Sequence, residues 1–191
     1  MNIKRIWLVI PTILLPYLVL FALATLFLSN KIALFEIIME KVFNNNALYL
    51  MASVLLCFLF AIVLNLIFFV LGVTKGWDAI SLAKSSMIIK LIQAPAYVLI
   101  FGLGALLMIT VFTFPFSFAL IFFDCITLVL TGLITAVAAV NSSRNGVFNS
   151  KEVALIIISQ LVFCVDVVAA IVFYLKLKKR LSANSQTPET V

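Results

Sequence analysis

The stretch FFDCITLVLTGL, residues 122–133, places an aspartate inside a run of apolar side chains, and it decides the class of fold. Of the 191 residues in the chain, 65% are hydrophobic and only 10% are charged. A soluble domain is about half apolar and about a quarter charged, so a soluble core of this size could not bury so many apolar side chains. The composition therefore predicts that the chain folds in lipid.

Five apolar runs, including the one around this stretch, are long enough for a helix of about 20 residues to cross a bilayer. They cover residues 6–28, 47–72, 88–112, 117–140 and 153–175. We therefore predict an all-α integral membrane helical bundle, one transmembrane domain over residues 1–181, followed by a disordered polar tail at 182–191. The first run exceeds the roughly 7–15 apolar residues of a signal peptide, so we expect a retained helix, bent at Pro11 and Pro16.

Two connectors carry amphipathic patterns. Between the first two runs, Ile32, Phe35 and Met39 recur at steps of three and four, and three asparagines follow at 44–46. Between the second and third runs, Trp77 precedes a polar face that begins at Asp78. Both patterns predict short amphipathic interfacial helices, for which ordinary packing at the headgroup level is the simplest interpretation. The third and fourth runs are joined near Pro115 by a tight hairpin or by a kinked, partly re-entrant one.

The basic residues do not orient five crossings. One side of the membrane would collect Lys4, Arg5, Lys75, Lys84, Lys90, Arg144 and Lys151, and the other Lys31, Lys41, Lys176, Lys178, Lys179 and Arg180. Seven against six gives no bias under the positive-inside rule. An even number of crossings would instead put both basic ends of the chain on one side.

Polar residues line one narrow face of three of the predicted helices. These residues form a candidate intramembrane ion or proton site, and they are Asp124, Thr127, Thr131, Asp166, Ser159 and Asn65. Asp124 and Asp166 are each 21 residues from Asn145, so antiparallel helices joined there would place the two carboxylates at one level. Gly132 and Ala136 form a small-residue pair that would let a neighbouring helix approach closely.

This polar face has two interpretations. In the first, the side chains provide hydrogen bonds that hold helices together, including threonine bonds back to their own helix. In the second, the two carboxylates form an ion or proton site, because two acids in contact cannot both stay ionised without a counter-ion. No Lys or Arg lies deep enough in the predicted spans to act as that counter-ion, so one acid would hold a proton or share a cation.

Several chemistries lack the residues they need. The chain has no histidine, and its three cysteines, Cys57, Cys125 and Cys164, lie in apolar runs, where we expect them to be buried. We therefore predict no metal site and no cofactor. Neither aspartate has the flanking residues of a presenilin-type protease, so we expect no enzymatic activity. The scattered basic residues form no patch for nucleic acid and are better suited to anionic lipid.

Three segments resemble a family of small uncharacterised multi-pass membrane proteins of Gram-positive, clostridia-like bacteria. They are IIKLIQAPAYVLIFGLG (88–104), FTFPFSFALIFFDCITLVLTGL (112–133) and FCVDVVAAIVFY (163–174), roughly the C-terminal half of the chain. The resemblance implies a location in a bacterial plasma membrane. It implies no activity, and it assigns no role to Pro95, Pro115, Asp124 or Asp166, which lie in the shared portion.

Two functions remain from these observations. We expect first a non-enzymatic accessory or assembly partner of a larger membrane system, in contact with the lipid bilayer and with another membrane protein or further copies of itself. The alternative is a small ion- or proton-coupled transporter or channel that uses Asp124 and Asp166. A membrane-embedded enzyme is the least favoured of the three classes.

Overall fold

Seven helices make up the part of the chain described by the computed structural model, residues 7–109 and 113–184, and no strand occurs in these residues. Four helices are long and apolar enough to cross a membrane: α2 (Ile10–Leu28), α4 (Ala47–Thr74), α5 (Ala79–Leu107) and α6 (Phe114–Arg144). The chain is thus a membrane protein by the length and composition of its helices. The predicted all-α helical bundle is confirmed.

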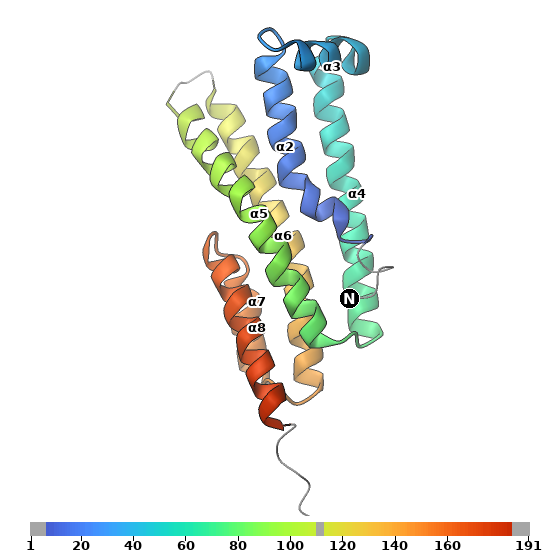
Figure 1. Cartoon of the computed structure of the whole chain (residues 1–191), viewed down its shortest axis with the longest axis vertical. Coiled ribbons are helices and arrows are strands. Elements are labelled where there is room, and N and C mark those ends of the chain that lie inside the picture. The colour runs from blue at the N-terminus through green and yellow to red at the C-terminus, as the bar shows by residue number, and fades with distance from the viewer. Residues whose placement is uncertain (1–6, 110–112, 185–191) are drawn as a thin grey trace, which may run out of the picture.

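The long helices alternate in direction (Figure 1). α2 runs to one end of the molecule, where α3 (Ala33–Phe43) lies across it, and then α4 returns, α5 rises and α6 descends. α3 is the first of the two predicted amphipathic helices, and it ends as expected at Asn44, whose left-handed backbone (φ 50°) terminates the helix. We call the end that carries α3 the α3 end, and the opposite end the hairpin end.

The prediction of a second, separate interfacial helix is wrong, because its residues form the first turns of α5. The Asp78 carboxylate accepts a hydrogen bond from the Ser81 N–H at 3.0 Å and caps the helix there, well before the predicted start at residue 88. Trp77, expected at the membrane surface, is only 7% exposed and packs edge-to-face on Phe68. As a result Lys90, expected at a helix end, lies about 16 Å along α5.

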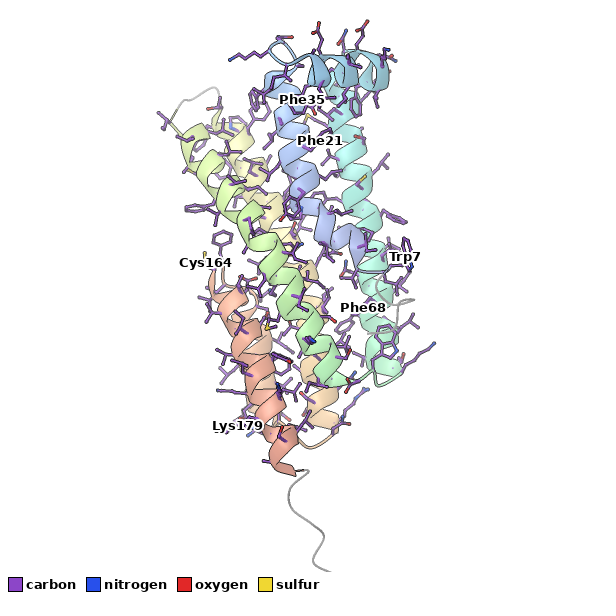
Figure 2. The ribbon with its side chains drawn as sticks, in the orientation of Figure 1. Trp7, Phe21, Phe35, Phe68, Cys164 and Lys179 are labelled. Atoms are coloured by element: carbon purple, nitrogen blue, oxygen red, sulfur yellow. The ribbon has the colours of Figure 1, made fainter. Side chains whose placement is uncertain are left out.

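The prediction of one continuous fifth helix over residues 153–175 is also wrong, because the chain turns back within this range. α7 (Ser150–Ser159) ends at a turn over residues 160–164, and α8 (Val165–Asn184) returns beside it. Figure 1 shows this hairpin alongside α5 and α6, and Figure 2 places Cys164 at its tip and Lys179 near its base. α8 continues through residues 182–184, which were expected in the polar tail, and residues 185–191 lie outside the described part.

The turn at the hairpin tip requires an unusual backbone conformation. Cys164 has φ 64°, in the left-handed region that disfavours residues with a Cβ atom by about 1–2 kcal/mol. Cys164→Gly should therefore raise the free energy of unfolding by about 0.5–1 kcal/mol, measured by thermal unfolding in one detergent. Cys57→Gly, inside α4, should lower it. A loss of stability in both variants would contradict the assigned turn.

The bundle is packed around α6, whose middle and final turns are buried by α4, α5 and the hairpin. Gly132 lies against the hairpin tip, where an added Cβ would stand 3.3 Å from the Gln160 Cβ. The predicted close approach of a neighbour to this glycine is confirmed. The three cysteines are free and exposed on the outside of the bundle, so the prediction that they are buried is wrong.

Candidate functional site

One face of α5 carries four polar side chains into the interior of the bundle. They are Ser86, Lys90, Gln93 and Tyr97, at steps of four, three and four residues. This spacing places them in one row along the helix. Each is 6% exposed or less, so each needs a partner inside the protein. The partners come from α2, α6, α8 and the row itself, as described next.

An ion pair between Lys90 and Asp166 lies at the centre of this row. The Lys90 Nζ donates to the Asp166 Oδ2 at 2.6 Å, and the two side chains are 0% and 2% exposed. Asp166 is the second residue of α8, so the pair joins the tip of the hairpin to the middle of α5. Removing one partner of such a pair leaves a buried charge without compensation, whereas in the intact pair each charge partly offsets the desolvation of the other.

Toward the α3 end, Gln93 connects α5 to α2, and Asn65 connects α4 to the same residue of α2. Its Nε2 donates to the Thr12 carbonyl of α2 at 2.7 Å, and its Oε1 accepts from the Tyr97 hydroxyl at 3.0 Å. Asn65 of α4 donates to the Thr12 hydroxyl and to the Ala61 carbonyl. These bonds fix α2 and α4 against α5, and the Asn65 Oδ1 is left buried without a hydrogen bond.

Toward the hairpin end, Ser86 begins a second chain of hydrogen bonds. Its hydroxyl lies 2.5 Å from the Thr135 hydroxyl of α6, which donates to the Gln160 Oε1 at 3.2 Å. Gln160 is the first residue after α7, so the tip is held to α6 as well as to α5. Together with the ion pair, this chain fixes the hairpin tip against both helices.

Asp124 makes no hydrogen bond to this network. Its Oδ1 is buried and has no hydrogen bond, and neither ion pair of the described residues includes it. The carboxylate lines a cavity of about 160 Å³ between α5 and α6, and the other lining residues are Ile100, Phe101, Gly104, Ala105, Met108, Ser117, Leu120 and Ile121. We call this cavity the lateral pocket, because Phe101, Ala105 and Ile121 on its rim are exposed on the outside of the bundle.

Neither ion pair of the described residues joins the two aspartates, and the residue count that predicted a level pair no longer applies. Contacts between Ser86 and Thr135, and between Ser117 and Gly104, set the register of α5 against α6 and place Asp124 opposite Tyr97. Lys90, which holds Asp166, lies seven residues from Tyr97, which is about 10 Å along the helix. The prediction counted residues along a continuous fifth helix, and the turn at 160–164 removes that basis.

The remaining predicted site residues do not gather around the aspartates. Thr127 and Thr131 donate to carbonyls of their own helix, Phe123 and Thr127 respectively, at 2.8 and 3.2 Å. Ser159 donates to the Ile156 carbonyl at 2.7 Å. The first interpretation, bonding within and between helices, fits these residues and Asn65. The statement that no cation lies deep enough is wrong, because Lys90 is fully buried beside Asp166.

The polar row of α5 was visible in the sequence but was divided between two predicted elements. The sequence pattern places Ser86 in a connector and Lys90 at the end of a span, which separates them from Gln93 and Tyr97. A helical face read across that boundary would have shown the four polar residues in register. The partners of this row could not be assigned, because no glycine, proline or break in hydropathy marks the turn that brings Asp166 back to α5.

The base of the hairpin is closed by an exposed ion pair. Glu152 forms a capping box with Asn149 at the start of α7, and its carboxylate accepts two hydrogen bonds from the Arg180 guanidinium of α8, at 2.6 and 2.9 Å. The guanidinium also lies 4.3 Å from the Phe148 ring centroid. The hydrogen bonds from Arg180 lower the pKa of Glu152 from 4.5 to about 2. The hairpin is thus fixed at its base as well as at its tip.

This pKa gives the hairpin base a defined pH response. A carboxylate with a lowered pKa stabilises the folded state above its unfolded pKa, and this contribution is lost as the pH falls toward the folded pKa. The difference in melting temperature between wild type and Glu152→Gln should therefore be constant above about pH 5 and shrink as the pH falls from 4.5 toward 2. Thermal unfolding over this pH range measures it, and a difference that does not change with pH would contradict the ion pair.

Among the described residues, no three His, Cys, Asp or Glu side chains lie together as the ligands of a metal ion would. The row on α5 can hold helices in place and can hold a proton or charge inside the bundle, while the lateral pocket offers one carboxylate to the outside. Comparisons with protein-family models, with curated proteins and with solved structures find no match to this chain.

Proposed function

We propose that this chain is a multi-pass protein of the plasma membrane that serves, without catalysis, as an accessory or assembly partner of a larger membrane system. The observation that carries the proposal is Asp124, an acid at membrane depth that has no partner within the described part of its own chain. An ionised carboxylate there costs about 2.5–3.5 kcal/mol on insertion scales unless another group compensates it. Its position on the lateral pocket makes a second protein the natural source of that group.

The distribution of basic residues supports a multi-pass topology with the hairpin end in the cytoplasm. Eight described lysines and arginines lie toward the hairpin end, and they are Lys75, Lys84, Arg144, Lys151, Lys176, Lys178, Lys179 and Arg180. Of the basic residues in the described part of the chain, two, Lys31 and Lys41, lie at the α3 end. Because the hairpin returns, the four basic residues of α8 change sides relative to the five-span prediction, and the positive-inside rule then favours one orientation.

The hairpin fits a segment that enters the membrane without crossing it. α7 has ten residues, so it rises about 15 Å, about half of a hydrocarbon core roughly 30 Å thick. A turn at such a depth exposes backbone polar groups and is tolerated only where protein or water covers it. Leu161, Val162 and Cys164 in the turn are exposed, while the Lys90–Asp166 pair and the Gln160 bond hold the turn against α5 and α6. We therefore assign these bonded groups a structural role in the accessory protein.

The proposal is tested by purifying the affinity-tagged full chain from its native membrane in a mild detergent and weighing the complex by native mass spectrometry. We expect one chain together with a second membrane protein in a fixed ratio. A monomer, or an assembly of this chain alone, would contradict the accessory role. Reconstitution of the purified species in nanodiscs, followed by a second mass measurement, controls for dissociation in detergent.

Ion- or proton-coupled transport is a second candidate, and the enclosed Lys90–Asp166 pair is the observation that favours it. Ionisable groups inside a membrane domain mark ion and proton pathways in many pumps and transporters. If this pair moves a proton, purified wild type in proteoliposomes should show pH-dependent flux that Asp166→Asn abolishes and Asp124→Asn spares. No flux in the wild type would count against transport and in favour of the structural role.

A further inference from the structure

The lateral pocket combines buried small residues with an uncompensated acid. Gly104 of α5 and Ser117 of α6 are buried and joined by a 2.9 Å hydrogen bond from the Ser117 hydroxyl to the Gly104 carbonyl. Ala105 lies exposed on the rim, so a neighbouring helix could approach α5 closely at this point. Asp124, from the next turns of α6, contributes the one charged side chain among the residues that line the pocket.

The depth of the carboxylate restricts what can compensate it. Asp124 is ten residues from the start of α6, which places it about 15 Å from that end of the helix and near the middle of a hydrocarbon core. A lipid headgroup lies at the membrane surface, so it does not reach this level. A cation at this depth has to be carried there by a membrane-spanning segment.

A second copy of this chain cannot supply that cation from its described residues. Lys90 is their one buried cation, and Asp166 already holds it at 2.6 Å. The other described lysines and arginines lie toward the two ends of the bundle. The described residues of a second copy therefore offer Asp124 no cation, which favours a different protein as its partner.

We infer that the lateral pocket receives a transmembrane helix of a different protein, which carries a lysine or arginine near the middle of the bilayer and pairs it with Asp124. This inference rests on the proposed accessory function and names the chemistry of its partner. A pair of this kind adds specificity as well as attraction, since a helix without the cation would leave the Asp124 carboxylate buried and uncompensated.

The inference is tested first by photo-crosslinking in intact membranes. A photo-crosslinking amino acid replaces Ile121 on the pocket rim, which is 45% exposed. The matched control replaces Leu55 of α4, which is 53% exposed, lies eight residues from the start of its helix, and does not line this pocket. We expect a crosslink to one other membrane protein from position 121 and none from position 55, and the crosslinked segment should contain a lysine or arginine in mid-span.

The second arm removes the charge. Asp124→Asn keeps the shape of the side chain, and it should reduce the amount of co-purified partner at least tenfold while leaving the melting temperature of the chain unchanged. Asp124→Lys should abolish binding, and replacement of the cation in the partner by aspartate should restore it. These reversed charges recreate the pair with its signs exchanged, which a purely structural role for Asp124 would not allow.

Three other outcomes would contradict the inference, and they differ in what they imply for the accessory function. A crosslink from position 121 to another copy of this chain, lost in Asp124→Asn, would overturn the inference in favour of two acids that share a proton. A partner that co-purifies equally with wild type and Asp124→Asn would overturn the inference and leave the accessory function standing. If no partner is found by crosslinking or by native mass spectrometry, both are wrong.

Discussion

Lys90→Met should lower the free energy of unfolding by about 3–5 kcal/mol, because it leaves the Asp166 carboxylate buried without a counter-ion. Asp166→Leu should have a similar effect, since it leaves the Lys90 ammonium fully buried and unpaired. Thermal or denaturant unfolding in one detergent measures both variants against wild type. Lys84→Met, at an exposed position six residues earlier on α5, is the matched control and should change stability by less than about 0.5 kcal/mol.

The double variant Lys90→Met/Asp166→Leu separates the pair from its two members. An apolar replacement of a buried ion pair at similar volume is often neutral or stabilising, so most of the lost stability should return. The double variant should also keep the hairpin in place, because Gln160 and the Glu152–Arg180 pair still hold its tip and base. If each single variant behaves like Lys84→Met, Lys90 and Asp166 do not form the enclosed pair.

The class of fold could be predicted because hydropathy reports directly on the solvent of each helix. Four apolar runs did become the long helices, and the amphipathic period of 33–43 became α3. Helix boundaries were less well predicted where polar residues begin a buried helix. Asp78 caps α5 ten residues before the predicted apolar run begins at residue 88, and the polar residues in that interval resemble a surface segment.

The hairpin could not be predicted from hydropathy, because an apolar run has the same composition whether it crosses a membrane or turns back halfway. The turn at 160–164 contains neither glycine nor proline, and its left-handed residue is a cysteine, so the usual signals of a turn are missing. One indirect signal was present. With five crossings and a cytoplasmic N-terminus, the basic segment from Lys176 to Arg180 would lie outside the cell, against the positive-inside rule. A returning hairpin places this segment on the cytoplasmic side.

The sequence identified the acidic residues of the candidate site, but it did not predict which residues lie next to them. Asp124 and Asp166 were correctly singled out as acids that need compensation, and each has a different solution in the structure. Asp166 is neutralised by Lys90. The two residues are 76 positions apart, so their spacing in the sequence could not indicate that they pair. Asp124 has no such partner among the described residues, and it is this difference that separates the structural core from the proposed interaction surface.

The most direct test of this account is the sidedness of the two ends of the bundle. Single cysteines at Glu40 and Ser182, both exposed positions, are introduced into a chain whose natural cysteines are replaced by alanine, and sealed vesicles are labelled with a maleimide that does not cross the membrane. With four crossings and a returning hairpin, the two positions lie on opposite sides, and Asn145→Cys labels with Ser182→Cys. Labelling of Glu40→Cys and Ser182→Cys from the same side would mean that the chain crosses a fifth time, and it would contradict the hairpin and the Lys90–Asp166 pair together.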